Sequence, residues 1–201
     1  AAALRLNQAI LESKAQSFAK YWDDLEALLD GTLESNEQPA YHQRLWSILF
    51  LFFPVLSTSL SSVENQFKLM QQLEGFGLAM LDEAGQAVNY HVVGLLQRCK
   101  QVVFVGDPIQ LEPVVNIAYQ IDKSIAEEYL PLASTYAQQK WGDAYLVSSS
   151  SAQSIADRAG NYYAEIGERK VGLPLLVHRR CLEPMFTIAN RIAYDHKMVS
   201  A

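Results

Sequence analysis

The chain has 201 residues, of which 50% are hydrophobic and 19% are charged, and this balance excludes a wholly disordered protein. Its net charge of −6 and its pI near 5.2 argue against tight nucleic-acid binding by these residues alone, because phosphates attract Lys and Arg. Cys99 and Cys181 are the only cysteines, which predicts free thiols in a reducing, cytoplasmic compartment and no zinc site.

Residues 1–52 are predicted to form a helical region. Apolar residues recur at heptad-like spacing over Leu4–Leu29, which predicts one amphipathic helix that packs on a partner helix. Asp30-Gly31 is a stop signal after it. The nearly continuous apolar block His42–Phe53 predicts a second, buried helix, which is too short to span a membrane. We therefore expect no membrane association.

Pro54 ends the second helix, and Val55-Leu56 is predicted to begin a strand. Three hydroxyl side chains, Ser57, Thr58 and Ser59, then precede a helix predicted over Leu60–Leu73. Such hydroxyls cap the exposed amides at a helix start, or they contact phosphates of a bound nucleic acid. Both interpretations stay open, because one residue can cap while its neighbour binds.

The segment Gly77–Val115 is predicted to organise the rest of the chain. The short apolar runs Leu78–Leu81 and Val102–Val105 fit strands that are buried on both faces, as in a parallel sheet. Val88–Cys99 between them is long enough for a crossover helix. The polar residues that follow each strand therefore fall at the carboxyl ends of the strands, where open α/β sheets place their ligand sites.

The residues at these two strand ends suit phosphate chemistry. Asp82 can hold a hydrated Mg²⁺, and Glu83 beside it can orient or deprotonate a water molecule. Gly106, Asp107 and a proline fix a tight turn after the second strand, and Gln110 then offers an uncharged donor and acceptor for a phosphate.

Further elements follow in the second half of the chain. Helices are predicted over Ile117–Leu130, Ala152–Gly160 and Glu183–Tyr194, and a strand is predicted over Leu173–Val177. The run Ser148–Ser151 indicates a flexible connection.

The motifs in this order resemble those of superfamily 1 helicases, most closely the 5′→3′ branch. DEAGQ at residues 82–86, followed 24 residues later by GDPIQLEP at residues 106–113, looks like helicase motifs II and III. The segment PVLSTSLSSV, residues 54–63, is similar to the family's strand-contacting segment. LLVHRRCLEPMFTIANRIAY, residues 175–194, resembles motif IV at the start of the second motor lobe.

The resemblance implies an α/β fold with a RecA-like parallel sheet flanked by helices. It implies a helical arm or insertion over residues 1–52, the C-terminal part of the first lobe over 53–165, and the start of the second lobe over 166–201. The first helix would then be a protruding arm, as the insertions in related motors are.

ATP and Mg²⁺ are the cofactors that the resemblance implies. Glu83, Gln110 and Arg180 are the implied catalytic residues: Glu83 activates water, Gln110 senses the γ-phosphate, and Arg180 acts as an arginine finger. The implied nucleotide-binding residues are Asp82, Gln86, Gly106 and Asp107, and Asp82 would hold the Mg²⁺ ion through a water molecule. Ser57, Thr58 and Ser59 would contact nucleic acid, with DNA favoured over RNA.

Two features depart from the family pattern. The chain contains no G-x-x-x-x-G-K-[ST] phosphate loop and no Gly-Lys pair, so we expect a fragment with an incomplete motor core that is inactive by itself. Arg179 stands where the family commonly has an aromatic residue, which puts a base-stacking role there in doubt.

Two functions of different classes follow from these observations. The first is part of an ATP-dependent helicase that couples hydrolysis to movement on nucleic acid. The alternative is a non-catalytic, helicase-derived binding module whose Leu4–Leu29 helix docks a partner protein; the missing phosphate loop favours it. A generic α/β domain does not explain why both motifs occur in order at this separation.

Overall fold

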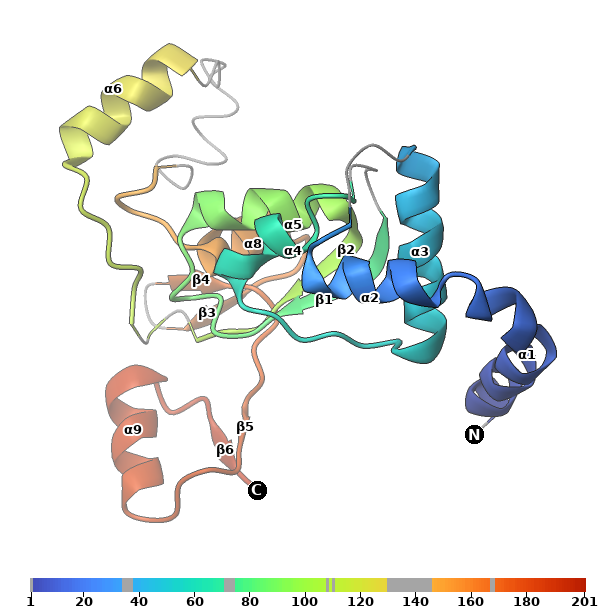
Figure 1. Cartoon of the computed structure of the whole chain (residues 1–201). Coiled ribbons are helices and arrows are strands. Elements are labelled where there is room, and N and C mark those ends of the chain that lie inside the picture. Colours follow the sequence, from blue (N-terminus) through green and yellow to red (C-terminus); the bar gives the residue numbers. More distant parts are fainter. Residues whose placement is uncertain are drawn as a thin grey trace. The chain divides into compact units, whose positions relative to one another are not determined.

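The computed structural model describes residues 2–33, 38–70, 75–107, 109, 111–129, 146–166 and 169–201 (Figure 1). Helices and short sheets alternate along the chain, as expected for the α/β class, whereas a complete RecA-like sheet stays a prediction. The chain folds as two compact units, Ala1–Ala79 with Gly94–Gln101, and Met80–Val93 with Val102–Ala201. The predicted domain limits at residues 52 and 165 stay predictions.

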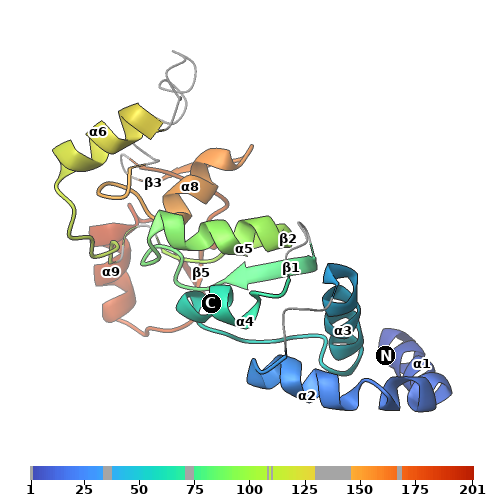
Figure 2. The ribbon, with the colours of Figure 1, turned by 45° about the horizontal axis from the view of Figure 1, so that its top comes forward.

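The first unit is mainly helical and contains a well-packed core. Its helices are α1 (Ala2–Ala19), α2 (Trp22–Asp30), α3 (Pro39–Phe52), η1 (Leu60–Ser62) and α4 (Val63–Gln66). Both α1 and α2 contact α3 (Figure 2). Leu45, Trp46 and Leu49 of α3 are at most 2% exposed, which confirms the predicted buried helix.

The single helix predicted over Leu4–Leu29 is wrong. The chain turns at Lys20-Tyr21, where the Tyr21 amide donates a 2.9 Å hydrogen bond to the Phe18 carbonyl, and α2 begins anew at Trp22. This turn interrupts the heptad stripe. Trp22 is 56% exposed, and no residue of α1 is buried. The side chains that α2 buries are Leu25 and Leu28.

The chain after α3 also differs from expectation. Residues 53–59 form no strand, and Val55 is 83% exposed. Of the helix predicted over Leu60–Leu73, the described residues form only η1 and α4, because the chain leaves the helical conformation at Phe67. Residues 71–73 lie outside the described residues. Leu69 and Met70 then enter the core of this unit. The predicted stop at Asp30-Gly31 is confirmed, since Gly31 ends α2 in the left-handed conformation with φ 71°.

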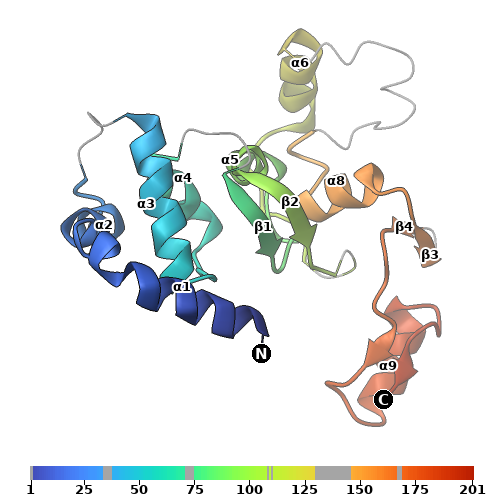
Figure 3. The same cartoon turned by 90° about the vertical axis from the view of Figure 1, so that its right-hand side faces the viewer.

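The predicted strand–helix–strand segment is confirmed. It consists of β1 (Phe76–Leu81), η2 (Asn89–Val92), α5 (Val93–Arg98) and β2 (Cys99–Phe104). β1 and β2 pair in a two-stranded sheet, and Figure 3 shows their arrows running in the same direction. Burial on both faces is wrong, because Leu78 is 56% and Met80 is 70% exposed. A sheet of two strands leaves part of its apolar surface open.

In the second unit, α6 (Tyr119–Tyr129) and α8 (Ala152–Ala159) confirm two predicted helices, α6 beginning two residues later than expected. The flexible connection predicted over Ser148–Ser151 is wrong. Asp122 accepts hydrogen bonds from the amide and the hydroxyl of Ser148, at 2.7 and 2.8 Å. Ser150 is buried, and Ser151 forms a capping box at the start of α8. The hydroxyls are therefore used to fix the segment.

The C-terminal part contains two small sheets. β3 (Ala164–Ile166) and β4 (Arg169–Val171) pair antiparallel, whereas β5 (Val177–His178) and β6 (Val199–Ser200) pair in parallel around α9 (Met185–Ala193). The strand predicted over Leu173–Val177 is therefore wrong up to Leu176.

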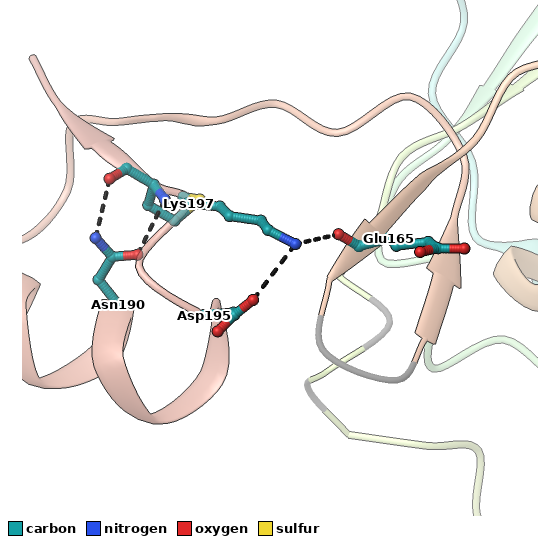
Figure 4. A network of polar contacts seen from close by, with 5 residues as sticks. Glu165, Asn190, Asp195 and Lys197 are labelled. Carbon is teal, nitrogen blue, oxygen red and sulfur yellow. Dashed lines mark hydrogen bonds and ion pairs between the residues drawn. The ribbon is translucent and has the colours of Figure 1, made fainter.

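Asn190 of α9 fixes the return of the chain to β6. Its side-chain amide donates a 2.9 Å hydrogen bond to the Met198 carbonyl and accepts one of 2.9 Å from the Met198 amide (Figure 4). Lys197 in the same loop contacts the Asp195 carboxylate and the Glu165 carbonyl. These bonds tie the loop before β6 to α9 on one side and to β3 on the other.

Candidate functional site

The acidic pair lies in a turn that immediately follows β1. Asp82 and Glu83 are both exposed, and the Glu83 amide donates a 3.0 Å hydrogen bond to the Asp82 carboxylate. Glu83 has φ 52°, a left-handed conformation that is costly for a residue with a Cβ. Gln86 donates a 3.2 Å hydrogen bond from its side chain to the Glu83 carboxylate. The turn thus presents two carboxylates and one amide to solvent, with one backbone position under strain.

The loop after β2 meets this acidic turn. The Val105 amide donates to the Leu81 carbonyl at 2.8 Å, and the Ala84 amide donates to the Val105 carbonyl at 3.0 Å. A Cβ on Gly106 would lie 2.9 Å from the backbone nitrogens of Ala84 and Gly85. Only glycine permits this close approach of the two backbones. The sequence prediction that both strand ends share one edge of the sheet is therefore confirmed.

Asp107 is held on both of its carboxylate oxygens. One oxygen accepts a 3.0 Å hydrogen bond from the Ile109 amide, which closes a turn, and the other accepts from the Tyr194 hydroxyl at the end of α9. The segment that resembles motif III is thus linked, through Asp107, to the segment that resembles motif IV. Pro108 and Gln110, the predicted γ-phosphate sensor, lie outside the described residues.

A cavity of about 850 Å³ in the second unit brings Arg180 to the same space as Gly106 and Asp107. Arg179 and Gln153 also line it, together with apolar side chains of β2 and of residues 173–177. Arg180 is exposed. The structure does not place Asp82 or Glu83 on the lining of this cavity. It therefore brings Arg180 to the loop after β2, and not to the acidic pair.

The predicted nucleic-acid residues belong to the first unit. Ser57, Thr58 and Ser59 are all exposed. Ser59 precedes η1 without a capping hydrogen bond from its side chain, and its hydroxyl instead contacts those of Ser61 and Ser62 at 3.1 and 2.7 Å. The capping interpretation of Ser59 is therefore not what the structure shows, and phosphate contact stays a prediction.

Residues that the sequence did not single out also hold the site. Gln153 and Asp157 of α8 connect the acidic turn to the C-terminal segment, and Tyr194 holds Asp107. The four-residue spacing of Gln153 and Asp157 places them on one face of a helix, and this spacing could have indicated their contact from the sequence. Tyr194 had no local signal, because its partner lies 87 residues away in the chain.

The donor set is compatible with one weakly held hard cation. Among the described residues, no group of three or more His, Cys, Asp or Glu side chains could hold a metal by itself. Mg²⁺ commonly takes one or two carboxylates and completes its shell with water and substrate phosphates. Asp82, whose carboxylate is exposed at the strand end, fits that role, which requires a phosphate-bearing ligand in addition.

Comparison with known proteins gives one result. Residues 33–117 match the family of the AAA domain, a domain found in superfamily 1 helicases. The match contains the acidic turn, the loop after β2 and the hydroxyl segment, and it points to a helicase-like ATPase domain. No curated protein and no solved structure matches the chain. In the part of the chain that the structure describes, every helix is too short or too polar to cross a membrane.

Proposed function

We propose that the chain is part of the motor of a superfamily 1, 5′→3′ helicase, which couples Mg-ATP hydrolysis to translocation on and unwinding of nucleic acid, with DNA favoured. One observation carries the proposal: the acidic turn after β1 and the Gly106 loop after β2 lie in backbone contact at one edge of the sheet. The AAA-domain match over residues 33–117 supports it independently.

The chain's own residues have distinct roles in this proposal. Glu83, exposed at the strand end and bonded to Gln86, orients and deprotonates the attacking water. Arg180 offsets the charge that develops on the γ-phosphate, and Gln110 senses that phosphate. Asp82 would hold Mg²⁺ through water, and the ion would neutralise phosphate charge when bound. Asp107 relays the state of the nucleotide site, and Ser57–Ser59 contact the nucleic-acid backbone.

The test separates nucleotide binding from hydrolysis in the natural polypeptide. Glu83→Gln keeps the shape and removes the base, so ATP affinity should stay within about twofold while turnover falls by roughly two to four orders of magnitude. Asp82→Asn should weaken Mg-ATP binding as well. Glu64→Gln, an exposed residue of α4, is the matched control and should change neither quantity. Normal turnover of Glu83→Gln would remove Glu83 from the site.

A second candidate function is a non-catalytic module that docks a partner protein through the helical region. Leu4 and Leu6 of α1 are 71% and 64% exposed, and this apolar surface favours the candidate. It predicts that Leu4→Asp and Leu6→Asp weaken partner binding, measured by co-purification, while Glu83→Gln has no effect on the protein's function. ATP turnover by the natural polypeptide would exclude it.

A further inference from the structure

The start of α8 is bonded directly to the acidic turn. The Ala152 amide donates to the Ala87 carbonyl at 2.9 Å, and the Gln153 amide donates to the Ala84 carbonyl at 3.1 Å. Ala84 and Ala152 are each 0% exposed. Because both acceptors belong to the turn that contains Glu83 or to its immediate continuation, a movement of that turn has to move the first residues of α8.

The Gln153 side chain continues this connection along the helix. Its Nε2 donates a 2.9 Å hydrogen bond to Oδ1 of Asp157, one turn further on. Its Oε1 is buried and has no hydrogen-bond partner among the described residues. A Cβ on Gly106 would lie 3.1 Å from this Oε1, so the side chain also abuts the loop after β2.

Asp157 passes the connection to the C-terminal segment. The same Oδ1 accepts a 2.9 Å hydrogen bond from the Gly172 amide. A Cβ on Gly172 would lie 2.8 Å from that oxygen, so a larger residue at this position would require the Asp157 carboxylate to shift. Gly172 follows β4, which contacts α8, and leads through residues 173–176 to β5 and Arg180. Figure 3 shows α8 between β2 and the β3–β4 hairpin.

We propose that Gln153 and Asp157 are positioning residues that couple the Asp82–Gln86 turn to the segment carrying Arg180. α8 is the rigid connector between them. Its amino end is fixed to the turn by two backbone hydrogen bonds, and Asp157 holds the Gly172 backbone from the next turn. The catalytic consequence rests on the proposed function, whereas the physical coupling does not, and the two are tested separately.

Hydrogen–deuterium exchange of the 201-residue chain tests the coupling without nucleotide. Asp157→Ala removes the shared acceptor, so exchange should rise about tenfold, the effect of one lost hydrogen bond, both at residues 172–180 and at residues 82–87. Asp157→Asn keeps an Oδ1 acceptor and should restore the parent pattern at both. Asp122→Ala is the matched control, because Asp122 also lies on a helix and its carboxylate also accepts two hydrogen bonds, both from Ser148. It should raise exchange near residues 146–150 only.

Gln153→Leu is a second variant, which should fold even if Asp157→Ala does not. Leucine removes a buried oxygen without a partner, which offsets the lost hydrogen bond to Asp157, so the thermal midpoint should stay close to that of the parent. Its loss of the bond to Asp157 should still raise exchange at residues 172–180. Unchanged exchange there, or an Asp157→Ala effect confined to Gly172 with residues 82–87 unaltered, overturns the coupling.

Turnover of the natural polypeptide tests the consequence for catalysis. Asp157→Ala should lower kcat roughly 10- to 100-fold, because misplaced groups lose their alignment, while KM for ATP stays within about twofold. Asp157→Asn should have nearly parental kcat. If the parent does not hydrolyse ATP, the proposed function fails and the exchange result stands alone. If the parent is active and Asp157→Ala has normal kcat, the positioning role fails and the helicase proposal is untouched.

Discussion

Glu83 combines the residue type expected of a base with a backbone conformation that favours glycine. At most positions Ala is preferred to Gly, because Gly loses more entropy on folding. Because Glu83 has φ 52°, Gly should be more stable than Ala at this position. We expect Glu83→Gly to be more stable than Glu83→Ala by about 1 kcal/mol, since both lose the same carboxylate and only Ala keeps the strain.

Urea denaturation of both variants measures this difference, with the same pair of substitutions at exposed Glu26 of α2 as the control. There the usual order, Ala above Gly by about 1 kcal/mol, should hold. An Ala variant at position 83 that equals or exceeds the Gly variant would show that the turn carries no strain.

The two cysteines should differ in reactivity. Burial raises the pKa of the Cys99 thiol, which is 6% exposed, whereas Cys181 is half-buried. Only the thiolate is nucleophilic, so Cys181 should be alkylated well before Cys99 at pH 8, as read by mass spectrometry of the native protein. In denaturant the two rates should converge. Equal rates in the native protein would contradict the burial of Cys99.

The raised pKa of Cys99 also sets the sign of a pH effect. The unfolded chain releases the thiol proton near its ordinary value of 9.0, while the folded chain retains it to higher pH. The folded state then binds more protons, so stability falls as pH rises through and above 9. Below that value the contribution of Cys99 is fully present.

At the scale of elements, the broken first helix changes which side chains stabilise the helical unit. Leu25 is 4% exposed and belongs to the core. Trp22 is 56% exposed and packs edge-on against Phe52, with 6.2 Å between the ring centroids. Leu25→Ala should cost about 3 kcal/mol, by loss of burial and by the cavity left. Trp22→Ala should cost only about 1 kcal/mol. Thermal unfolding monitored by circular dichroism compares them, and a larger loss for Trp22→Ala would restore the heptad interpretation.

The sequence predicted elements best where their signals were local. The apolar runs around β1 and β2 and the Asp30-Gly31 stop were sufficient, because each depends on neighbouring residues. The Leu4–Leu29 prediction failed because a heptad stripe does not reveal a one-turn break, and the Ser148–Ser151 prediction failed because its fixing partner, Asp122, lies 26 residues away. In the candidate site, the acidic pair and Gly106 could be predicted, whereas Tyr194 and the Gly172 contact depend on tertiary structure.

For the whole molecule, the chain by itself should lack ATPase activity. Asp82 and Glu83 can act only on phosphates that a separate cradle holds, and the 201 residues contain no phosphate loop. A phosphate-release assay with single-stranded DNA present should give no turnover above the buffer rate. Turnover of about 1 s⁻¹ or faster would show that another part of this chain binds the phosphates.

The open face of β1 has a consequence for work at the bench. Leu78 and Met80 of the two-stranded sheet expose apolar surface to solvent, and Val103 on β2 is 43% exposed. Dyes that brighten on contact with apolar surface are commonly used to diagnose loosely packed states. Here such a dye would fluoresce on the native protein. A bright signal would therefore report the exposed apolar side chains of β1 and β2 rather than partial unfolding. Near-ultraviolet circular dichroism, which follows the fixed environment of Trp46, is the safer criterion of folding for this chain.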